Sequence, residues 1–339
     1  MPHLSKRDRL AKAALQLGVT QLLEASPKRR SLTVLTYHRI GNHDLTNYDP
    51  AVYSATATDF DDQVSYLRRF HHVLSLEESI DFLRYRDSRV RSGVLITFDD
   101  GYVDNYQTAF PILRSHGVPA TFFLCTSYIG TATIPWWDQI AYLIRKTKNT
   151  AIRFDYPDVH QLDLSAGREV ALRKILKVFK SPQTTDPNRM IAALEDACEV
   201  SSPVGAERLF LNWEEASEML EGGMSIGSHT HTHCVLAKLP YEVQVQELRT
   251  SRTILEERLR TKIASLAYPV GGPAAFSAST MSAASDAGYQ IAFSNYGGFN
   301  YLRRVNRFDI RRNSIDHGTT LCRFRLQCAL GAVTGAQYF

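Results

Sequence analysis

The feature that most constrains this chain is an alternation of short β-prone runs with amphipathic helical patterns. Runs at 32–37, 94–98 and 120–124 each precede such a pattern, and the alternation continues over most of 31–318. A strand followed by a helix returns to a parallel neighbour, and about seven such strands favour closure into a barrel. We therefore predict an α/β fold, namely a distorted (β/α) barrel of about seven parallel strands.

One segment interrupts this alternation. Residues of about 130–215 contain three helical patterns where strands are expected, which predicts a helical insertion within a domain at 31–318. Residues 1–30 are expected to form an amphipathic helix followed by a basic segment. Residues 319–339 are expected to form a C-terminal helix that packs on the domain.

The N-terminal segment carries an apolar stripe of Leu10, Ala14, Leu17 and Leu22, followed by the basic run 28–30. Such a stripe fits a helix packed on its own domain. It also fits a helix that lies on an anionic membrane surface, which the basic residues would favour. Both interpretations stay open.

Residues 7–24 contain charges and a glycine and no uninterrupted apolar region, so we expect no secretory signal. The sequence also has no run of 18 apolar residues that could span a bilayer. The expected location is cytoplasmic, with peripheral contact at the inner membrane surface through residues 7–30.

The composition excludes several classes. With 44% hydrophobic and 22% charged residues the chain is of the globular type, and a net charge of +4 without a basic aromatic motif argues against nucleic acid as a partner. The five cysteines are scattered and form no CxxC pair, which argues against a disulfide framework or a cysteine zinc site.

Polar residues follow several predicted strands. These are His38, the pair Asp99-Asp100 and the histidines at 229–233, and a fourth predicted strand ends in Pro269-Val270-Gly271. In a parallel barrel the carboxyl ends of the strands share one mouth, where such residues are typically catalytic. The alternative for Asp99-Asp100 is an exposed Asp-Gly turn that closes a hairpin.

The histidines favour a metal site. His229 and His233 are four residues apart, which places both imidazoles on one side of a helical turn. Together with Asp100 they form a set of two histidines and one carboxylate, which catalytic zinc uses with an open position for water. Because iron oxygenases use the same set, the ligands alone leave the metal open.

TFDDG at 97–101 and HTHTH at 229–233 together resemble the polysaccharide deacetylase family, the NodB-homology domain of carbohydrate esterase family four. PATFF at 119–123 adds to the resemblance, which extends over roughly 31–318. It implies a metal-dependent hydrolase that removes N-acetyl groups from the sugars of a polysaccharide or glycolipid.

The resemblance also implies roles for individual residues. Asp100, His229 and His233 would bind the divalent metal, usually zinc in this family. Asp99 would be the general base that deprotonates the attacking water, and the backbone N–H of Tyr102 would support the oxyanion. His231 receives no role.

A general acid must protonate the leaving amine, and two histidines are candidates. His38 lies in LTYHRIG, which resembles the branch that acts on poly-N-acetylglucosamine-like polymers. His317 lies late in the chain, where much of the family has its acid, but it lacks the Leu-x-Leu-His setting. We favour His38.

One family motif departs from its pattern. The expected Arg-x-Pro appears as Ala267-Tyr268-Pro269, so the arginine that steadies the base is absent from its usual place. Arg312 is predicted to replace it, with exposed surface charge as the alternative. Tyr268, Pro269 and Trp137 are predicted to contact substrate, although a Trp at 137 would also suit a core.

The predicted partner is an N-acetylated glycan or a lipid-linked saccharide. The expected cytoplasmic location favours the lipid-linked saccharide. A related alternative is an O-acetyl esterase or a deformylase acting on a lipid-linked sugar. An alternative of another class is a glycan-binding protein with a relic site. The missing motif arginine favours this alternative, whereas the intact DD and H-x₃-H set argues against it.

Overall fold

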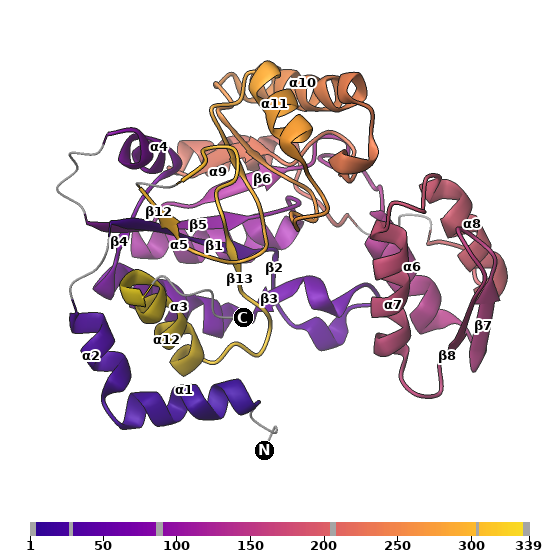
Figure 1. Ribbon diagram of the computed structural model, residues 1–339, viewed down its shortest axis with the longest axis horizontal. Coiled ribbons are helices and arrows are strands. Elements are labelled where there is room, and N and C mark those ends of the chain that lie inside the picture. The colour runs from indigo at the N-terminus through magenta and orange to yellow at the C-terminus, as the bar shows by residue number, and fades with distance from the viewer. Residues whose placement is uncertain (1–4, 27–29, 86–90, 204–207, 303–304, 335–339) are drawn as a thin grey trace. The chain divides into compact units, whose positions relative to one another are not determined.

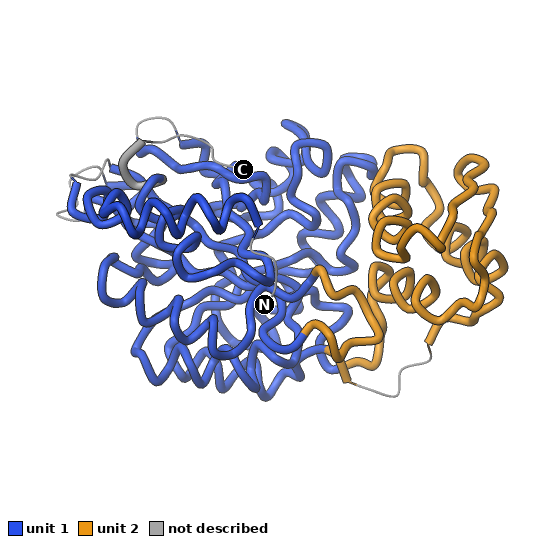
Figure 2. The backbone as a smooth tube through the Cα atoms, turned by 90° about the horizontal axis from the view of Figure 1, so that it is seen from below, with its two compact units in different colours: residues 1–42, 52–130, 210–339 blue, residues 43–51, 131–209 orange. Residues whose placement is uncertain are grey.

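The computed structural model describes residues 5–26, 30–85, 91–203, 208–302 and 305–334. The chain divides into two compact units, shown in Figure 2. The first comprises residues 1–42, 52–130 and 210–339, and the second comprises 43–51 and 131–209. Across the described ranges, no helix has both the length and the apolar character needed to cross a membrane.

A parallel sheet forms the centre of the first unit (Figure 1). Its strands run in the spatial order β11-β10-β9-β6-β5-β1, with β4 parallel to β5. The bounds are β1 (Ser31–Tyr37), β4 (His72–Val73), β5 (Ser92–Phe98), β6 (Thr121–Leu124), β9 (Ser225–Ser228), β10 (Ser265–Ala267) and β11 (Ile291–Phe293).

The segment 310–314 connects the two ends of this order. Ile310 pairs in parallel with Phe293 of β11, and β13 (Asn313–Ser314) pairs in parallel with β1. The segment is not one continuous strand, because the side-chain amide of Asn300, in β12 (Asn300–Tyr301), hydrogen-bonds both backbone groups of Arg311. With this segment as the seventh strand, the predicted distorted barrel of parallel strands is confirmed as a half-barrel.

Helices surround the sheet, and most begin at caps that the sequence encodes. Ser75 with Glu78, and Asn212 with Glu215, form complete capping boxes. The helix that follows β5 starts as a π-helical turn at Asn105–Ala109, because Pro111 has no N–H to donate. The helices are α3 (Ala57–Phe70), α4 (Leu76–Arg84), α5 (Phe110–His116), α9 (Trp213–Glu221), α10 (Tyr241–Leu259), α11 (Ala278–Asp286) and α12 (Leu321–Thr334).

Strand alternation determines which side chains enter the barrel. Tyr37, Phe98 and Phe122 stack in a row across β1, β5 and β6, with ring centroids 5.3 and 4.7 Å apart, and Phe60 of α3 packs on that row. Because successive side chains point to opposite faces, Thr97 and Asp99 project away from α3 and into the barrel.

The N-terminal segment forms two helices, because Gly18 adopts a left-handed conformation (φ 75°) between α1 (Lys6–Gln16) and α2 (Val19–Ala25). Both pack on α12 (Figure 1). Of the two interpretations of the leucine stripe, packing of the leucines on the domain does not hold, because Leu10, Leu17 and Leu22 are exposed. The opposite side of the helices is buried, at Asp8, Ala11 and Thr20. Lys28 and Arg29 lie outside the described residues.

The second unit contains the predicted helices and one hairpin that the sequence did not suggest. Its elements are α6 (Trp136–Lys146), the antiparallel pair β7 (Ala151–Phe154) and β8 (His160–Asp163), α7 (Arg168–Lys180) and α8 (Pro187–Cys198). Trp136 stacks on Phe179 at 4.3 Å and meets Trp137 edge-on, which gives this unit an aromatic core.

Candidate metal-dependent active site

Parallel register brings the polar strand ends together. Tyr37 pairs with Phe98, so His38 and Asp99 leave adjacent strands at the same level. The N–H of Asp99 donates to the carbonyl of Tyr37 at 3.0 Å. On the next pair of strands, the N–H of His229 donates to the carbonyl of Leu124 at 2.8 Å. The sheet itself therefore positions His38, Asp99 and His229 at one mouth.

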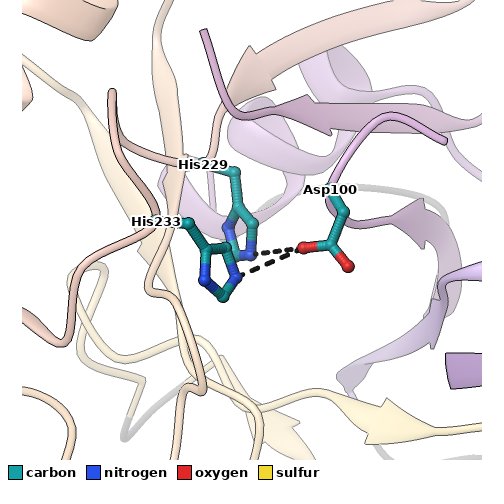
Figure 3. A group of neighbouring side chains, drawn as sticks. All are labelled: Asp100, His229 and His233. Carbon is teal, nitrogen blue, oxygen red and sulfur yellow. Dashed lines mark ion pairs between the residues drawn. The ribbon is translucent and has the colours of Figure 1, made fainter. Parts of the chain in front are cut away.

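The side chains of the three predicted ligands point toward one another, as Figure 3 shows. Oδ1 of Asp100 lies 3.4 Å from Nε2 of His229 and 3.3 Å from Nε2 of His233. All three side chains are buried, and their ligand atoms lie within 4.8 Å of one another. This is a compact set of two nitrogen donors and one oxygen donor.

These distances fit ligands of one ion better than they fit hydrogen bonds. Charge-assisted N–H···O bonds are shorter, about 2.7–2.9 Å. Two ligands that lie about 2.0–2.1 Å from a tetrahedral ion are instead separated by about 3.3–3.4 Å. Among the described residues, Oδ1 of Asp100 has no hydrogen-bond partner. An orphaned buried carboxylate oxygen facing two imidazoles is what a divalent metal would satisfy.

The loop around the histidines fixes their orientation. Nδ1 of His229 lies 2.8 Å from the carbonyl of Ala267, an acceptor, so Nδ1 carries the proton and Nε2 presents its lone pair to the site. The hydroxyl of Thr230 accepts the N–H of His233 at 3.0 Å. His231 is turned away, with its Nδ1 2.8 Å from the hydroxyl of Thr126.

The backbone of these loops is strained. Four residues have φ between 55° and 71°, a region that residues other than glycine rarely adopt: Asp100, Thr230, His233 and Val270. At Gly101 (φ 82°) a Cβ would come within 2.8 Å of Leu124 Cδ2. Such strain typically accumulates where a fold holds functional groups in place.

Asp99 lies beside the ligands but has a different partner. Its two oxygens accept hydrogen bonds from Nη1 and Nη2 of Arg312 at 2.7 and 2.8 Å. Arg312 is fully buried, and its Nε donates to the carbonyl of Ser294 at 3.0 Å. The side chain predicted to replace the motif arginine thus forms a bidentate pair with the predicted base.

The charges of the two carboxyls follow from these partners. Burial would raise the pKa of Asp99, but Arg312, with His229 and His38, outweighs burial and lowers that pKa. Burial likewise opposes ionisation of Asp100, yet His229 and His233 hold its pKa well below the usual range. Both groups are therefore carboxylates at neutral pH.

The two candidate acids occupy different settings. His38 is half-buried and interacts electrostatically with both Asp99 and Asp100. Its backbone is clamped, because its N–H donates to Oγ of Ser54 at 3.0 Å and its carbonyl accepts Nδ2 of Asn105 at 2.7 Å. His317 is exposed, in the turn that follows β13.

A buried ion pair supports the His38 segment, and sequence reasoning missed it. Oδ2 of Asp104 accepts Nε of Arg39 at 2.7 Å, and Oδ1 accepts the N–H of Ile40 at 3.0 Å. The guanidinium of Arg39 lies between the rings of Tyr53 and Tyr102, 4.5 and 4.6 Å from their centroids. Asp104 could have been suspected as a further acid just after the TFDDG motif.

The predicted substrate contacts are largely internal residues. Tyr102 is buried and stacks on Phe210, so its backbone rather than its ring would face a ligand. Tyr268 is buried, and its hydroxyl donates to the carbonyl of Phe308. Pro269 is buried at a tight turn, and Trp137 belongs to the second unit. Their contacts with substrate stay predictions.

Comparison with known proteins places this chain in a family. Residues 87–292, more than half of the chain, match the family model for polysaccharide deacetylase. The chain therefore belongs to the polysaccharide deacetylase family, as its motifs predicted.

Individual relatives agree with this assignment. A poly-beta-1,6-N-acetyl-D-glucosamine N-deacetylase of Staphylococcus epidermidis is 31% identical over 116 residues, which are 31% of this chain and 39% of the relative. A relative from Bacillus subtilis is 22% identical over 265 residues, 78% of this chain. The matches span less than two thirds of these relatives, 64% of the Bacillus protein and 39% of the Staphylococcus protein.

Solved structures share the fold. The Streptococcus pyogenes deacetylase PplD in complex with acetate matches 88% of this chain and 97% of its own, with a TM-score of 0.57 at 19% identity. IcaB from Ammonifex degensii matches 90% of this chain and 98% of its own, with a TM-score of 0.55 at 19% identity.

Proposed function

We propose that this chain is a metal-dependent N-deacetylase that hydrolyses the acetamide of an N-acetylated sugar. The observation that carries the proposal is the division of labour between two adjacent carboxylates. Asp100 faces His229 and His233 at 3.4 and 3.3 Å, while Asp99 is held by Arg312 at 2.7 and 2.8 Å. These different partners support a metal-binding role for Asp100 and the role of general base for Asp99.

Asp100, His229 and His233 would hold the metal, for which we propose zinc because it is the usual metal of the polysaccharide deacetylase family and suits this donor set. A divalent metal bound there would make water more acidic and polarise a carbonyl oxygen. The chain's own residues then supply the proton transfers and the positioning. The fixed tautomer of His229 directs the lone pair of Nε2 toward the ion, and the positive φ of Asp100 orients its carboxylate toward the histidines.

Asp99 accepts the proton of the attacking water. It is ionised at neutral pH, and the arginine holds its carboxylate in one orientation. The water oxygen bonds to the acetyl carbon, and the carbonyl oxygen becomes an oxyanion that the N–H of Tyr102 would support.

His38 gives a proton to the sugar nitrogen as the C–N bond breaks, so acetate and a free amine leave. Its position beside Asp99 across adjacent strands supports this role over His317. Breaking an amide needs such an acid, because an unprotonated amine anion is a poor leaving group.

The substrate we propose is an N-acetylglucosamine-type glycan, either as a polymer or as a lipid-linked saccharide. The name of the Staphylococcus epidermidis relative supports the sugar. Tyr268, Pro269 and Trp137 stay as proposed substrate contacts, with Tyr268 and Pro269 acting through the shape of the turn that they form.

Acetate release from N-acetylglucosamine oligomers and from a lipid-linked N-acetylglucosamine tests the proposal. The protein is assayed after chelation and again after one equivalent of zinc is added. Zinc-dependent acetate release with a matching gain of free amine is expected. Release only from O-acetylated sugars, or formate only from N-formyl sugars, would favour the esterase or the deformylase. Glycan binding without turnover would indicate a binding protein.

A further inference from the structure

The acidic side chains of α1 and α2 form hydrogen bonds with residues of the domain on which these helices pack. Oδ1 of Asp8 accepts the hydroxyl of Thr320 at 2.9 Å. The carboxylate of Glu24 accepts Nε and Nη2 of Arg325 at 3.0 and 2.9 Å, and also the hydroxyl of Tyr66 at 2.9 Å. Both acidic residues of the first 30 positions therefore face the domain rather than solvent.

The outer side of the same helices is apolar. Leu10, Leu17 and Leu22 are 69%, 79% and 69% exposed, and Val19 is also exposed. Leu10 and Leu17 are seven residues apart, so they lie on one side of the α1 segment. Isolated exposed leucines are ordinary, but several large ones within 13 residues form a surface that usually has a partner.

The charges around this surface are of one sign. Lys6, Arg7, Arg9 and Lys12 of α1 are all exposed. The first 30 residues contain seven Lys and Arg against two acids, a net charge of +5. Since the whole chain has a net charge of +4, all other residues together sum to −1. The excess positive charge of the sequence therefore lies in the segment that also carries the exposed leucines.

We propose that this outer face of α1 and α2 docks peripherally on the surface of a bilayer containing anionic phospholipid. The leucines enter the boundary between headgroups and acyl chains, and the basic side chains lie at the lipid phosphates. A second copy of the chain is a poorer partner, because the same surface on both sides would bring two clusters of net positive charge together. The proposal is independent of the deacetylase activity.

Co-sedimentation of the full chain with phosphatidylcholine vesicles, with and without one quarter phosphatidylglycerol, tests this docking. Binding is expected to the anionic vesicles, weak for the neutral ones, and lower at high salt. The double variant Leu17→Ser/Leu22→Ser should bind at least about tenfold more weakly. The matched control is Leu45→Ser, which replaces a leucine of the second unit that is 82% exposed and should leave binding unchanged.

A charge pair completes the design. Arg9→Gln/Lys12→Gln should weaken binding to anionic vesicles by about tenfold or more, since each basic residue close to an anionic membrane adds favourable electrostatic free energy of binding. Lys148→Gln/Lys174→Gln, at exposed positions of the second unit, is the control and should bind as the wild type does.

Circular dichroism of each variant shows whether the helices are retained. The proposal is overturned if the chain does not bind anionic vesicles, or if it binds neutral vesicles equally well. It is also overturned if well-folded leucine variants bind like the wild type. A wild-type dimer in light scattering that the leucine variants dissolve, without lipid binding, would assign the face to a second copy instead.

Discussion

The two halves of the candidate site are built from neighbouring buried carboxylates, Asp99 and Asp100, that differ in their partners. On the Asp99 side each carboxylate oxygen is satisfied by a short hydrogen bond from a buried guanidinium. On the Asp100 side the nearest donors are 3.3–3.4 Å away, and Oδ1 has no hydrogen-bond partner among the described residues. The oxygens of Asp99 are thus paired with a cationic side chain, whereas Oδ1 of Asp100 belongs to a group of three side chains that could hold a metal ion.

The backbone explains how one dipeptide serves two purposes. Asp99 ends a regular strand, so its side chain projects into the barrel toward Arg312. Asp100 adopts a positive φ of 71°, which turns its side chain toward the histidines. The positive φ at Asp100 therefore separates the carboxylate proposed to move a proton from the carboxylate proposed to bind a cation.

The largest effect is expected from breaking the metal half. His229→Ala should lower kcat/KM by about 10⁴-fold, because several kcal/mol of charge stabilisation depend on the ion. His231→Ala is the matched control in the same loop, since His231 contacts Thr126 rather than the ligands, and it should keep most activity. Steady-state acetate release measures both. Equal losses in the two variants would contradict the ligand assignment.

Breaking the base half should cost less. Asp99→Asn removes the proton acceptor and should lower kcat by about 10³-fold, within the range of general acid–base catalysis. It also leaves the buried Arg312 without its counter-ion, so we expect the free energy of unfolding to fall by about 3–5 kcal/mol. Urea unfolding and acetate release measure the two effects separately. A folded variant with wild-type turnover would exclude Asp99 as the base.

The general acid is expected to contribute about 10²-fold in kcat. His38→Ala should show this loss on an acetylated oligosaccharide, and His317→Ala on the same substrate should stay near wild type. The converse result would transfer the role to the late histidine. The rates should also respond to the leaving group, with His38→Ala least impaired on substrates whose amine departs more easily.

The supporting arginine should have the smallest effect on rate and the clearest effect on pH. Arg312→Met is expected to lower kcat/KM by about 10–100-fold, as for other partners that orient a reactive group. In the wild type, Asp99 loses its charge only as pH falls below its usual value of 3.8. Without the arginine, burial dominates and raises the pKa of Asp99, so the acidic limb of the pH–rate profile should move to higher pH.

The same pair has a consequence for stability, with a definite sign. Because folding lowers the pKa of Asp99, its contribution to stability is present above pH 3.8 and is lost as pH falls through the lowered value. The control for both measurements is Arg311→Met, which changes the adjacent arginine that stacks over Tyr296. A pH profile that moves equally in both variants would contradict the specific role of Arg312.

Sequence could predict the fold and the candidate ligands because both depend on local patterns. Strand and helix periodicity defines a parallel barrel, and parallel strands carry their terminal residues to one mouth. The spacing of His229 and His233 suggested a pair of ligands, but the helical turn expected there is wrong, because the segment is a loop in which Thr230 and His233 have positive φ. Arg312 was predicted only because the arginine of the Arg-x-Pro motif is absent and another arginine was needed to replace it. No local pattern around Arg312 indicates that its side chain contacts Asp99.

Other features could not be predicted, for identifiable physical reasons. The carbonyl of Ala267 that orients His229 is a backbone group, which every residue has. The hydrogen bond from Asn105 to the carbonyl of His38 comes from the first residue of a π-helical turn, a feature that no periodic pattern in the sequence marks. The leucine stripe showed that the N-terminal helix has an apolar face, but only tertiary contacts decide whether that face is covered.

Metal content of Asp99→Asn and Asp100→Asn, purified side by side and loaded with zinc, tests the central claim most directly. The account predicts about one zinc per chain in Asp99→Asn, with activity lost, and little or no zinc in Asp100→Asn. Equal zinc content in the two folded variants, whether both retain the metal or both lose it, would contradict the division of this carboxylate pair.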